Sequence, residues 1–480
     1  MAARIRRSVW SLPEGDPTFV WYRRAVVELL TRPVSDPTSW RYMAAVHGVP
    51  EGTPVPSGAG TFWDQCQHQS WFFLPWHRGY ITAFEAVIAK TVVALGGPAD
   101  WALPYWNYSE DLAKNPNARL MPPDFFNRTL SDGSPNALWS RRANVSNGDF
   151  NLNSSVVTLA ALQFRNFTNS VPGRPSGFGG PVTGFNPGGG DNGGIENLPH
   201  NRVHVQIGGN SGFMTDPSTA ALDPIFWVHH CNIDRLWEVW RNQGPQFRNP
   251  TEADWRSTVP FPMHDGDGQP FTYFSQDMLD TTKVLHGYQY DSVPVAHEAP
   301  SEEALEAAMA PLPGRPELAG SSTGPVSLES DVTRTTVSMQ TRQMTRSFVE
   351  STKPTPHHVY LNLENITGSG TPGDYKVYVY RQDNEIDSML AGVMTTFGLE
   401  RASNPNLSHG GSGINHVFDI TALADRLGLT VGTAAQLHVR FEREGLAATE
   451  DAVPLGLEDF VPRLKRGSAI KVGRVSVYYD

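Results

Sequence analysis

Two groups of histidines, each in an aromatic-rich segment, constrain the fold of this chain more than any other feature of its sequence. The groups are far apart along the chain, so a fold that buries both must bring distant segments together. Buried imidazoles need partners, because burying an unsatisfied polar group costs free energy. We therefore expect two metal sites built from nitrogen ligands. The first group is His47, His68 and His77, and the second is His200, His204, His229 and His230.

The second group carries the stronger spacing signal. His200 and His204 are four positions apart, so on a helix both imidazoles leave the same face and can bind one ion. Such a pair on its own is more often an ordinary surface or core pair. Here it is followed by His229 and His230, in a segment that we interpret as a buried aromatic helix. The combination favours metal binding.

The first group is weaker evidence by itself. The alternative is an aromatic core that holds satisfied histidines, and without the second group we would prefer it. Neutral imidazole binds copper, zinc, iron and nickel, so ligand type alone does not identify the metal. Structural zinc usually recruits cysteine, and the chain has only Cys66 and Cys231, which favours a redox-active metal pair. Aromatic residues between the histidines indicate a dry pocket: Trp71, Phe72, Phe73 and Trp76.

Composition excludes several classes of partner. The net charge of −11 argues against nucleic acid or an anionic membrane as the main partner. No run approaches the roughly 18 apolar residues that a membrane-spanning helix needs. No apolar stretch follows the arginines at the start, so no secretory signal peptide is visible. We expect a soluble protein with no membrane partner, either cytoplasmic or exported without a visible signal peptide.

The length of 480 residues predicts two or three domains. Residues 1–292 contain both histidine groups and several segments whose apolar residues have helical spacing. Residues 293–355 are rich in proline, glycine, serine and threonine, and we expect a linker there. In residues 356–480 apolar and polar residues alternate, which predicts a C-terminal antiparallel β-sandwich domain.

Two long motifs carry a family resemblance. Residues Cys66–Arg78 and Asp223–Trp237 closely resemble the two copper-binding signatures of the tyrosinase family, which includes catechol oxidases and the molluscan haemocyanins. The resemblance covers residues 1–292 well and the C-terminal part more loosely. It implies a mainly α catalytic domain, a four-helix bundle around a dinuclear copper site, which periodicity alone does not predict. It also implies two copper ions as cofactors and dioxygen as co-substrate.

The resemblance implies a role for each histidine and for one cysteine. In the pair His229-His230 the family uses the second histidine as the ligand. Cys66 lies two positions before His68, an arrangement that some family members convert into a thioether between the two side chains; the alternative is a buried free thiol. Carried over by position, the first copper is bound by His47, His68 and His77, and the second by His200, His204 and His230.

Two further residues match positions that bear on catalysis in the family. Glu196 lies four positions before His200, where similar sequences have a glutamate that holds an ordered water near the copper pair. Asn201 matches the residue that helps this water to remove the proton of a phenol, which matters because phenolate is the better copper ligand. The alternatives are an acid favoured by a helix N-terminus and an ordinary exposed asparagine.

The ends of the expected catalytic domain also resemble plant and fungal relatives. These carry an arginine near the start and a Tyr-x-Tyr motif, which Tyr288–Tyr290 matches here. The candidates for this arginine near the start are Arg4, Arg6 and Arg7. Separately, we expect Asp234 and Arg235, just past the last ligand, to form an ion pair.

The C-terminal part resembles the β domain of latent plant and fungal enzymes. In those enzymes the domain places a bulky residue over the copper pair. By this resemblance we expect residues 356–480 to cover the active site, with Phe397 or Leu399 as the covering residue.

The resemblance predicts an oxidoreductase, a tyrosinase or polyphenol oxidase that hydroxylates monophenols in the ortho position and oxidises o-diphenols to o-quinones. Glu196 and Asn201 favour hydroxylation in addition to catechol oxidation. A catechol oxidase or o-aminophenol oxidase without monophenolase activity and a haemocyanin-like oxygen carrier stay open. A dinuclear hydrolase would need bridging carboxylates that the groups lack. The expected partners are small phenolic substrates and not nucleic acid, and a homo-oligomer stays open.

Overall fold

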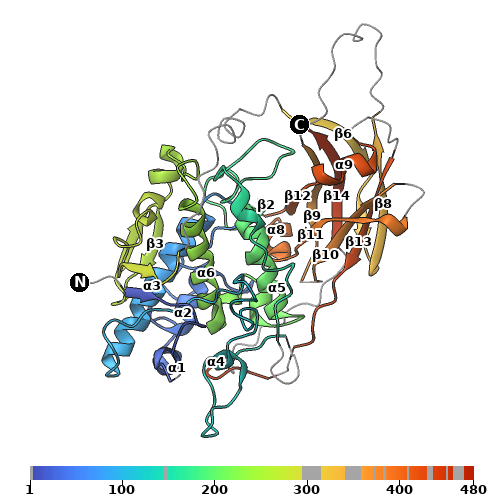
Figure 1. Cartoon of the computed structure of the whole chain (residues 1–480). Coiled ribbons are helices and arrows are strands. Elements are labelled where there is room, and N and C mark those ends of the chain that lie inside the picture. Colours follow the sequence, from blue (N-terminus) through green and yellow to red (C-terminus); the bar gives the residue numbers. More distant parts are fainter. Residues whose placement is uncertain are drawn as a thin grey trace.

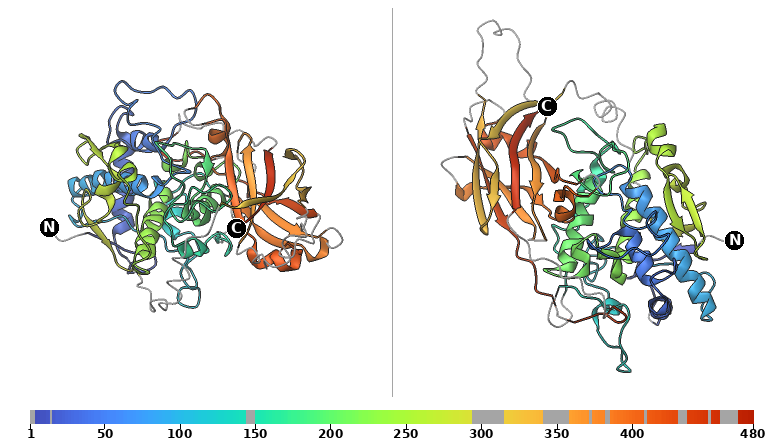
Figure 2. Two further views of the ribbon diagram at one scale, coloured as in Figure 1. Left: turned by 90° about the horizontal axis from the view of Figure 1, so that it is seen from above. Right: turned by 180° about the vertical axis from the view of Figure 1, so that it is seen from behind.

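The chain folds into a helical part, the described residues within 4–293, and a β part, the described residues within 315–480, which lie side by side (Figures 1 and 2). The computed structural model describes residues 4–13, 15–143, 150–293, 315–340, 358–370, 373–381, 385–407, 410–429, 436–449, 452–457 and 470–480. The helical part with its histidines and the C-terminal, mostly antiparallel sheet confirm the predicted fold class. None of the helices in the described residues has the length and apolar character that crossing a membrane requires.

Four helices surround the histidines (Figure 1). In α3 and α6, which pack against each other, nearly every side chain is buried. The helix α1 (Thr18–Thr31) packs against α3 from outside, and α4 (Pro123–Phe126) is a single turn. The four helices are α2 (Trp40–His47), α3 (Phe73–Ala94), α5 (Arg202–Gly208) and α6 (Pro224–Arg241).

Local sequence explains where the longest helices begin. Asp223 precedes α6, and its side chain accepts a hydrogen bond from the N–H of Ile225 at 3.0 Å. Pro224 then occupies the first helical position, where no N–H is needed. The helix α3 begins at Phe73, which places Pro75 in the first turn, where proline is tolerated.

A buried ion cluster ties the start of the chain to α3 and α6. Asp234 of α6 accepts hydrogen bonds from Arg6 and Arg78, at N–O distances of 3.3 Å and 2.5 Å. Two tyrosine hydroxyls of the Tyr-x-Tyr motif also donate to Asp234. The expected arginine is therefore Arg6. The expected pair of Asp234 with Arg235 is wrong, because Arg235 instead donates to the carbonyl of Ser292 at 2.6 Å.

Replacing Asp234 with asparagine is expected to lower the free energy of unfolding of the helical part by about 3–5 kcal/mol, because two buried guanidinium groups lose a charged partner. Urea unfolding followed by tryptophan fluorescence measures the change. The matched control is Asp267→Asn, since Asp267 pairs with Lys90 at the exposed surface and should cost less than about 1 kcal/mol. Equal losses in the two variants would contradict the importance of the buried cluster.

The β part is one continuous sheet that curls round its own apolar core, so that its layers face each other (Figure 2). The strand order is β11-β10-β13-β8-β6-β14-β9-β12-β2, with β7 paired to β14, and β11 approaches β12 where the sheet curls. The strands are β6 (Glu317–Ser322), β7 (Val326–Leu328), β8 (Val332–Met339), β9 (Val359–Thr367), β10 (Tyr375–Tyr380), β11 (Met389–Met394), β12 (Ile414–Asp419), β13 (Gln436–Arg443) and β14 (Ile470–Tyr479). Two short helices, α8 (Leu399–Ser403) and α9 (Thr421–Leu427), lie between strands.

The prediction of a linker over residues 293–355 is wrong for residues 317–339, which form β6, β7 and β8 of this sheet. The strand β8 has the sequence VTRTTVSM, in which only Val337 is buried. A strand with so few buried side chains has a weak apolar alternation, although its threonines and valines favour β-structure. Most of the rest of the predicted linker, residues 294–314 and 341–355, lies outside the described residues.

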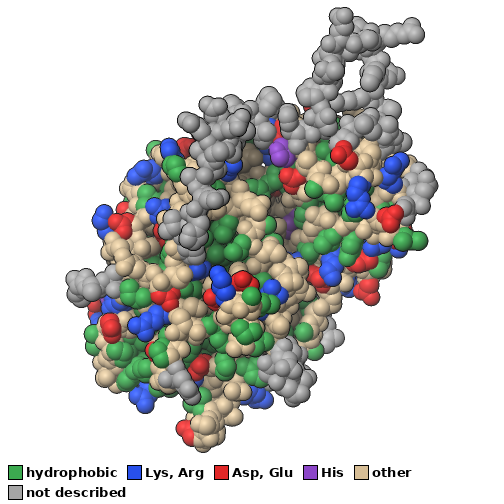
Figure 3. Space-filling view, viewed as in Figure 1, with side chains coloured by type: hydrophobic (Ala, Val, Ile, Leu, Met, Phe, Trp, Pro, Cys, Tyr) green, Lys and Arg blue, Asp and Glu red, His purple; other side chains and the backbone are tan. Residues whose placement is uncertain are grey.

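Strand β2 (Gly190–Asp191) comes from the helical part and joins the sheet of the β part. It pairs in parallel with β12, with Gly190 opposite Ile414 and Asp191 opposite Asn415. A cavity of about 630 Å³ lies beside this junction and is lined by residues of both parts, and Figure 3 shows a hollow between them. Ion pairs also cross the interface: Arg401–Asp64, Arg202–Asp374, Arg202–Glu444 and Arg174–Asp480.

Short two-stranded sheets complete the helical part. The first joins β1 (Arg4–Arg6) to β5 (Tyr288–Tyr290) in parallel and so holds the start of the helical part against the end of that part. The second is the antiparallel pair of β3 (Phe261–His264) and β4 (Pro270–Tyr273), which packs against α3. There Gly79 is required, because a Cβ on it would lie 2.0 Å from the ring of Tyr273.

Candidate metal centre

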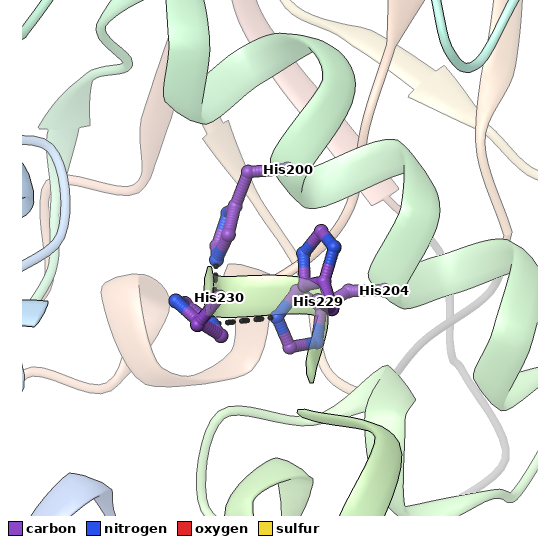
Figure 4. A group of neighbouring side chains, drawn as sticks. All are labelled: His200, His204, His229 and His230. Carbon is purple, nitrogen blue, oxygen red and sulfur yellow. Dashed lines mark hydrogen bonds between the residues drawn. The ribbon is translucent and has the colours of Figure 1, made fainter. Parts of the chain in front are cut away.

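Three histidines of the second group bring their Nε2 atoms together (Figure 4). His200 lies in the helical turn η3 (Glu196–Asn201), His204 in α5 and His230 in α6. The Nε2 atom of His230 is 3.3 Å from Nε2 of His200 and 3.3 Å from Nε2 of His204. All three rings are buried. Nitrogen atoms that converge in this way can serve as ligands of one metal ion.

Hydrogen bonds to Nδ1 determine which ring nitrogen is free to bind a metal. The Nδ1 atom of His204 donates to the carbonyl of Met214 at 2.8 Å, and Nδ1 of His200 donates to Oδ1 of Asn201 at 2.8 Å. A carbonyl oxygen only accepts, so Nδ1 carries the proton and Nε2 carries the lone pair. Both lone pairs face the ring of His230, and a metal ion there would satisfy them.

The first group forms a similar triangle. Its ring centroids are 5.4 Å apart for His47 and His68, 5.6 Å for His47 and His77, and 5.5 Å for His68 and His77. Backbone carbonyls accept from Nδ1 of His47 and of His77, each at 2.8 Å. All three Nε2 atoms are buried and have no hydrogen-bond partner among the described residues. Buried unsatisfied nitrogen atoms are rare in folded proteins, which supports an ion at this position.

The two triangles lie side by side. The rings of His77 and His230 stack with their centroids 4.6 Å apart and their planes 13° apart. The rings of His68 and His200 are 5.9 Å apart. Among the described residues, the two candidate ligand groups include no carboxylate. The two clusters are therefore consistent with a dinuclear copper site, because imidazole nitrogen is a suitable copper ligand.

Burial keeps these imidazoles neutral. Desolvation lowers the pKa of His47 to about 4 and that of His200 to about 3. The rings are therefore uncharged at neutral pH, which is the form that binds a metal ion. Desolvation likewise lowers the pKa of the remaining four well below the usual range: His68, His77, His204 and His230.

Glu196 is a fully buried carboxyl beside the loop that carries His68. Its two oxygen atoms accept hydrogen bonds from the backbone N–H of Gln69, at 2.9 Å and 3.0 Å. Burial raises the pKa of Glu196 to about 8, although the N–H groups of Gln69 and Gly193 oppose the shift. A carboxyl whose pKa is near neutrality can both take up and release a proton during turnover.

The raised pKa of Glu196 predicts how the stability of the metal-free protein depends on pH. The neutral Glu196 carboxyl contributes to the free energy of unfolding. This contribution is fully present below the ordinary pKa of about 4.5 and is lost as the pH rises through about 8. Glu196→Gln stays neutral, so it should become more stable than the wild type as the pH rises, by up to about 5 kcal/mol at about 1.4 kcal/mol per pKa unit.

Urea unfolding of the metal-free proteins at a series of pH values between 5 and 9 measures this difference. Glu28→Gln is the matched control, because Glu28 is an exposed residue of α1. A stability difference between Glu196→Gln and the wild type that stays constant over this range would contradict the assignment.

Asn201 is buried against a candidate ligand and is not an exposed helix residue. Its Oδ1 accepts a hydrogen bond from Nδ1 of His200.

His229, which we placed outside the ligand set, belongs to the same cluster as His200, His204 and His230, since the centroid of its ring lies 5.0 Å from that of His204. Its Nδ1 is 3.1 Å from the hydroxyl of Tyr108. The choice of His230 over His229 as ligand stays a prediction.

Cys66 contacts the histidine to which the resemblance links it. Its Sγ lies 3.3 Å from Nδ1 of His68, and the thiol is free and buried. Burial raises the pKa of Cys66 to about 12, so the side chain is a neutral thiol at physiological pH. The two side chains are close enough for the expected thioether.

The β part covers the histidines with Phe397, which is 1% exposed. The ring of Phe397 stacks on that of His204, with centroids 4.4 Å apart. It also meets the rings of His200 and His68 edge-on, at 5.6 Å and 5.7 Å. Leu399, the other candidate, instead packs in the apolar core of the β part. Of the two, Phe397 is therefore the residue over the site.

Sequence reasoning missed two amide side chains at the site, Gln69 and Asn192. The Nε2 atom of Gln69 donates to Oδ1 of Asn192 at 2.9 Å, and Nδ2 of Asn201 donates to the same oxygen at 3.2 Å. Amides lack a distinctive spacing. The only sequence signal was position, because Gln69 directly follows a predicted ligand.

Comparison with known proteins supports this reading of the site. A family profile described as the common central domain of tyrosinase matches residues 37–243, and a domain of unknown function (DUF7868) matches residues 315–480. The chain is 34% identical to tyrosinase HcTyr1 of Hahella sp. (strain CCB-MM4) over 99% of both chains. It is 31% identical to the chloroplastic polyphenol oxidase E of Solanum lycopersicum over 47% of this chain and 39% of that protein.

Solved structures share the fold over the whole chain. Latent apple tyrosinase matches with a TM-score of 0.61 at 20% identity, covering 100% of this chain and 97% of that one. Deoxygenated haemocyanin from Rapana thomasiana matches with a TM-score of 0.51 at 16% identity, covering 98% of this chain and 100% of that one. The same overall fold thus occurs in an enzyme and in a haemocyanin.

Proposed function

The chain belongs to the tyrosinase family of type-3 copper proteins, and we propose that it oxidises phenols with dioxygen at a pair of copper ions. The proposed reactions are the ortho-hydroxylation of monophenols and the oxidation of o-diphenols to o-quinones. The observation that carries the proposal is the meeting of two triangles of buried, neutral imidazoles.

In this proposal the six histidines hold the ions and the rest of the chain controls access and protons. The copper pair, when bound, supplies the electron transfer to dioxygen. Aromatic rings next to the imidazoles exclude water. The ring centroid of Phe226 is 5.0 Å from that of His47, and the ring centroid of Phe73 is 4.8 Å from that of His200. The first ion would bind to His47, His68 and His77, and the second to His200, His204 and His230.

We assign the removal of the phenol proton to Glu196 and Asn201. Among the described residues, Glu196 accepts hydrogen bonds only from backbone and amide N–H groups, and burial raises its pKa to about 8, so it can take up a proton near neutral pH. Asn201 accepts from Nδ1 of His200, which directs Nε2 of that ring to the metal. A water held between these side chains would carry the proton from the phenol to the carboxylate.

The test is to load the protein with copper and measure three quantities. We expect two copper ions per chain, a strong near-ultraviolet absorption band when hydrogen peroxide is added, and quinone formation from a monophenol and from a catechol. A single copper ion per chain, or no such band, would contradict the coupled pair. Activity with zinc in place of copper would favour a hydrolase.

An oxygen carrier is the second candidate, favoured by the cover that Phe397 forms over the histidines. A carrier needs dioxygen to reach the metal and larger phenols to be kept out. The two functions are separated by assaying catechol oxidation before and after cleavage at a protease site inserted within residues 294–314. Reversible oxygen binding without oxidation in both states would support the carrier.

We propose that Cys66 and His68 become joined by a thioether. A ring carbon–hydrogen bond and the S–H bond are lost, a carbon–sulfur bond forms, and dioxygen accepts the two electrons and two protons released. We expect the intact mass of copper-loaded, aerated protein to be lower by two hydrogens than that of protein kept metal-free and anaerobic, with Cys66→Ser showing no such difference. An unchanged mass after repeated turnover would exclude the bond.

We also propose that the β part keeps the enzyme latent. Phe397 occupies the space next to three candidate ligands, where a phenol would have to enter. Ion pairs hold the two parts together around it, including Arg401 with Asp64 at 2.5 Å and Arg202 with Asp374 at 2.7 Å. Small phenols would then reach the copper pair only when this contact opens.

A further inference from the structure

A chain of amide side chains connects the loop of the first histidine group to a ligand of the second. Gln69, directly after His68, donates from Nε2 to Oδ1 of Asn192 at 2.9 Å. Asn201 donates from Nδ2 to the same oxygen at 3.2 Å, and its own Oδ1 accepts from Nδ1 of His200 at 2.8 Å. Asn192 therefore lies between Gln69, which hydrogen-bonds to Glu196, and Asn201, which hydrogen-bonds to His200.

Gln69 also orients the buried carboxyl. Its backbone N–H donates to both oxygens of Glu196, and its Nε2 lies 3.4 Å from Oε1 of the same group. The side-chain Oε1 of Gln69 accepts a hydrogen bond from the N–H of Gly189 at 2.8 Å. The backbone of Gln69 has a φ of 47°, an uncommon conformation for a residue other than glycine, asparagine or aspartate. Surrounding hydrogen bonds must hold such a residue in place.

The oxygen of Asn192 sets which way round the carboxamide of Asn201 lies. In the observed orientation Nδ2 faces this acceptor and Oδ1 faces the Nδ1 proton of His200. A flipped carboxamide would bring a donor against the donor of His200 and an acceptor against the acceptor of Asn192. Both hydrogen bonds would be lost at a buried site, where unsatisfied groups are costly. The acceptor at Asn192 thus favours a single arrangement.

The backbone of Asn192 is anchored by the β part. It directly follows β2, in which Asp191 lies opposite Asn415 of β12. The side chain borders the cavity of about 630 Å³ between the two parts, as do Asn197 and Leu198. A truncated side chain at this position therefore opens into existing space and leaves the packed core unchanged, so a variant should fold.

We propose that Gln69 and Asn192 are positioning residues that fix the carboxamide of Asn201 and the carboxyl of Glu196, and thereby support hydroxylation of monophenols more than oxidation of catechols. The second half of this inference rests on the proposed function. A monophenol has one weakly acidic hydroxyl, so it depends on an aligned proton acceptor. A catechol is more acidic and offers a second hydroxyl, so it tolerates misalignment better.

The test compares Asn192→Ala with Asn192→Asp, which keeps the acceptor oxygen, and with Asn197→Ala, a matched truncation that borders the same cavity. The first readout needs no metal. In metal-free protein labelled with ¹⁵N-histidine, the Nδ1 proton of His200, assigned by its loss in His200→Gln, should exchange with solvent at least tenfold faster in Asn192→Ala. It should stay protected in the other two variants.

The second readout uses the copper-loaded proteins. Asn192→Ala should bind two copper ions and lose at least tenfold in the ratio of monophenol hydroxylation to catechol oxidation. Asn192→Asp should recover most of that ratio, and Asn197→Ala should keep it. An equal fall in both activities, or an unchanged ratio, would overturn the role in hydroxylation.

The two readouts separate this inference from the proposed function. If the wild type oxidises no phenol, the proposed function fails, yet the proton exchange of His200 still decides whether Asn192 positions Asn201. If exchange is unchanged in Asn192→Ala, the positioning is wrong whatever the activity.

Discussion

Replacing His204 with alanine is expected to leave a single copper ion per chain and to slow quinone formation at least about a thousandfold, or about 4 kcal/mol in activation free energy. His204 is buried, its Nδ1 is held by the carbonyl of Met214, and its Nε2 lies 3.3 Å from Nε2 of His230. Alanine leaves the second triangle with two nitrogen ligands, which hold an ion poorly. Metal analysis and a catechol assay on the same sample measure both effects.

The matched control is His264→Ala. His264 is also a buried histidine of the helical part, but its ring packs against Phe62 at 4.0 Å and belongs to neither candidate ligand group. This variant reports what the loss of a buried imidazole does to stability, and it should keep both ions and full activity. Two bound ions and undiminished quinone formation in His204→Ala would disprove the proposed site.

Five of the six candidate ligands could be predicted from sequence because they lie in a strong local signal, whereas His47 was assigned mainly by the family resemblance. His200 and His204 have helical spacing, and His77 and His230 lie within long aromatic motifs. Which ring nitrogen faces the metal could not be predicted. That depends on backbone carbonyls that only the fold brings to the rings, such as the carbonyl of Met214 beside His204.

The parts of the fold that sequence missed are those with weak apolar patterns. In β8 most side chains are polar and only Val337 is buried, so the alternation that identified β9 and β14 was absent there. The amide chain through Gln69 and Asn192 was missed for a related reason. Gln69 and Asn192 are more than a hundred positions apart, and hydrogen bonds between amides leave no periodicity in a sequence.

Phe397→Ala is expected to raise catechol oxidation by the full-length, copper-loaded protein about ten- to a hundredfold. Burying a phenylalanine side chain contributes about 1.5–3 kcal/mol, and Phe397 is 1% exposed against three imidazoles. Each 1.4 kcal/mol is about a factor of ten in an equilibrium. The uncovered fraction of molecules should therefore rise by that factor, and the activity should rise with the uncovered fraction. Initial rates at a fixed catechol concentration measure the change.

The control for Phe397→Ala must separate an opened site from a loosened β part. Phe418→Ala removes the same atoms from the core of the β part, where the ring packs against Gly392 and His416 and not against the candidate ligands. It should lower the stability of the β part and activate less. Equal activation by the two variants would assign latency to the docking of the β part as a whole. No activation by Phe397→Ala would mean that phenols are kept out by something other than this ring, because its removal leaves space directly above His204.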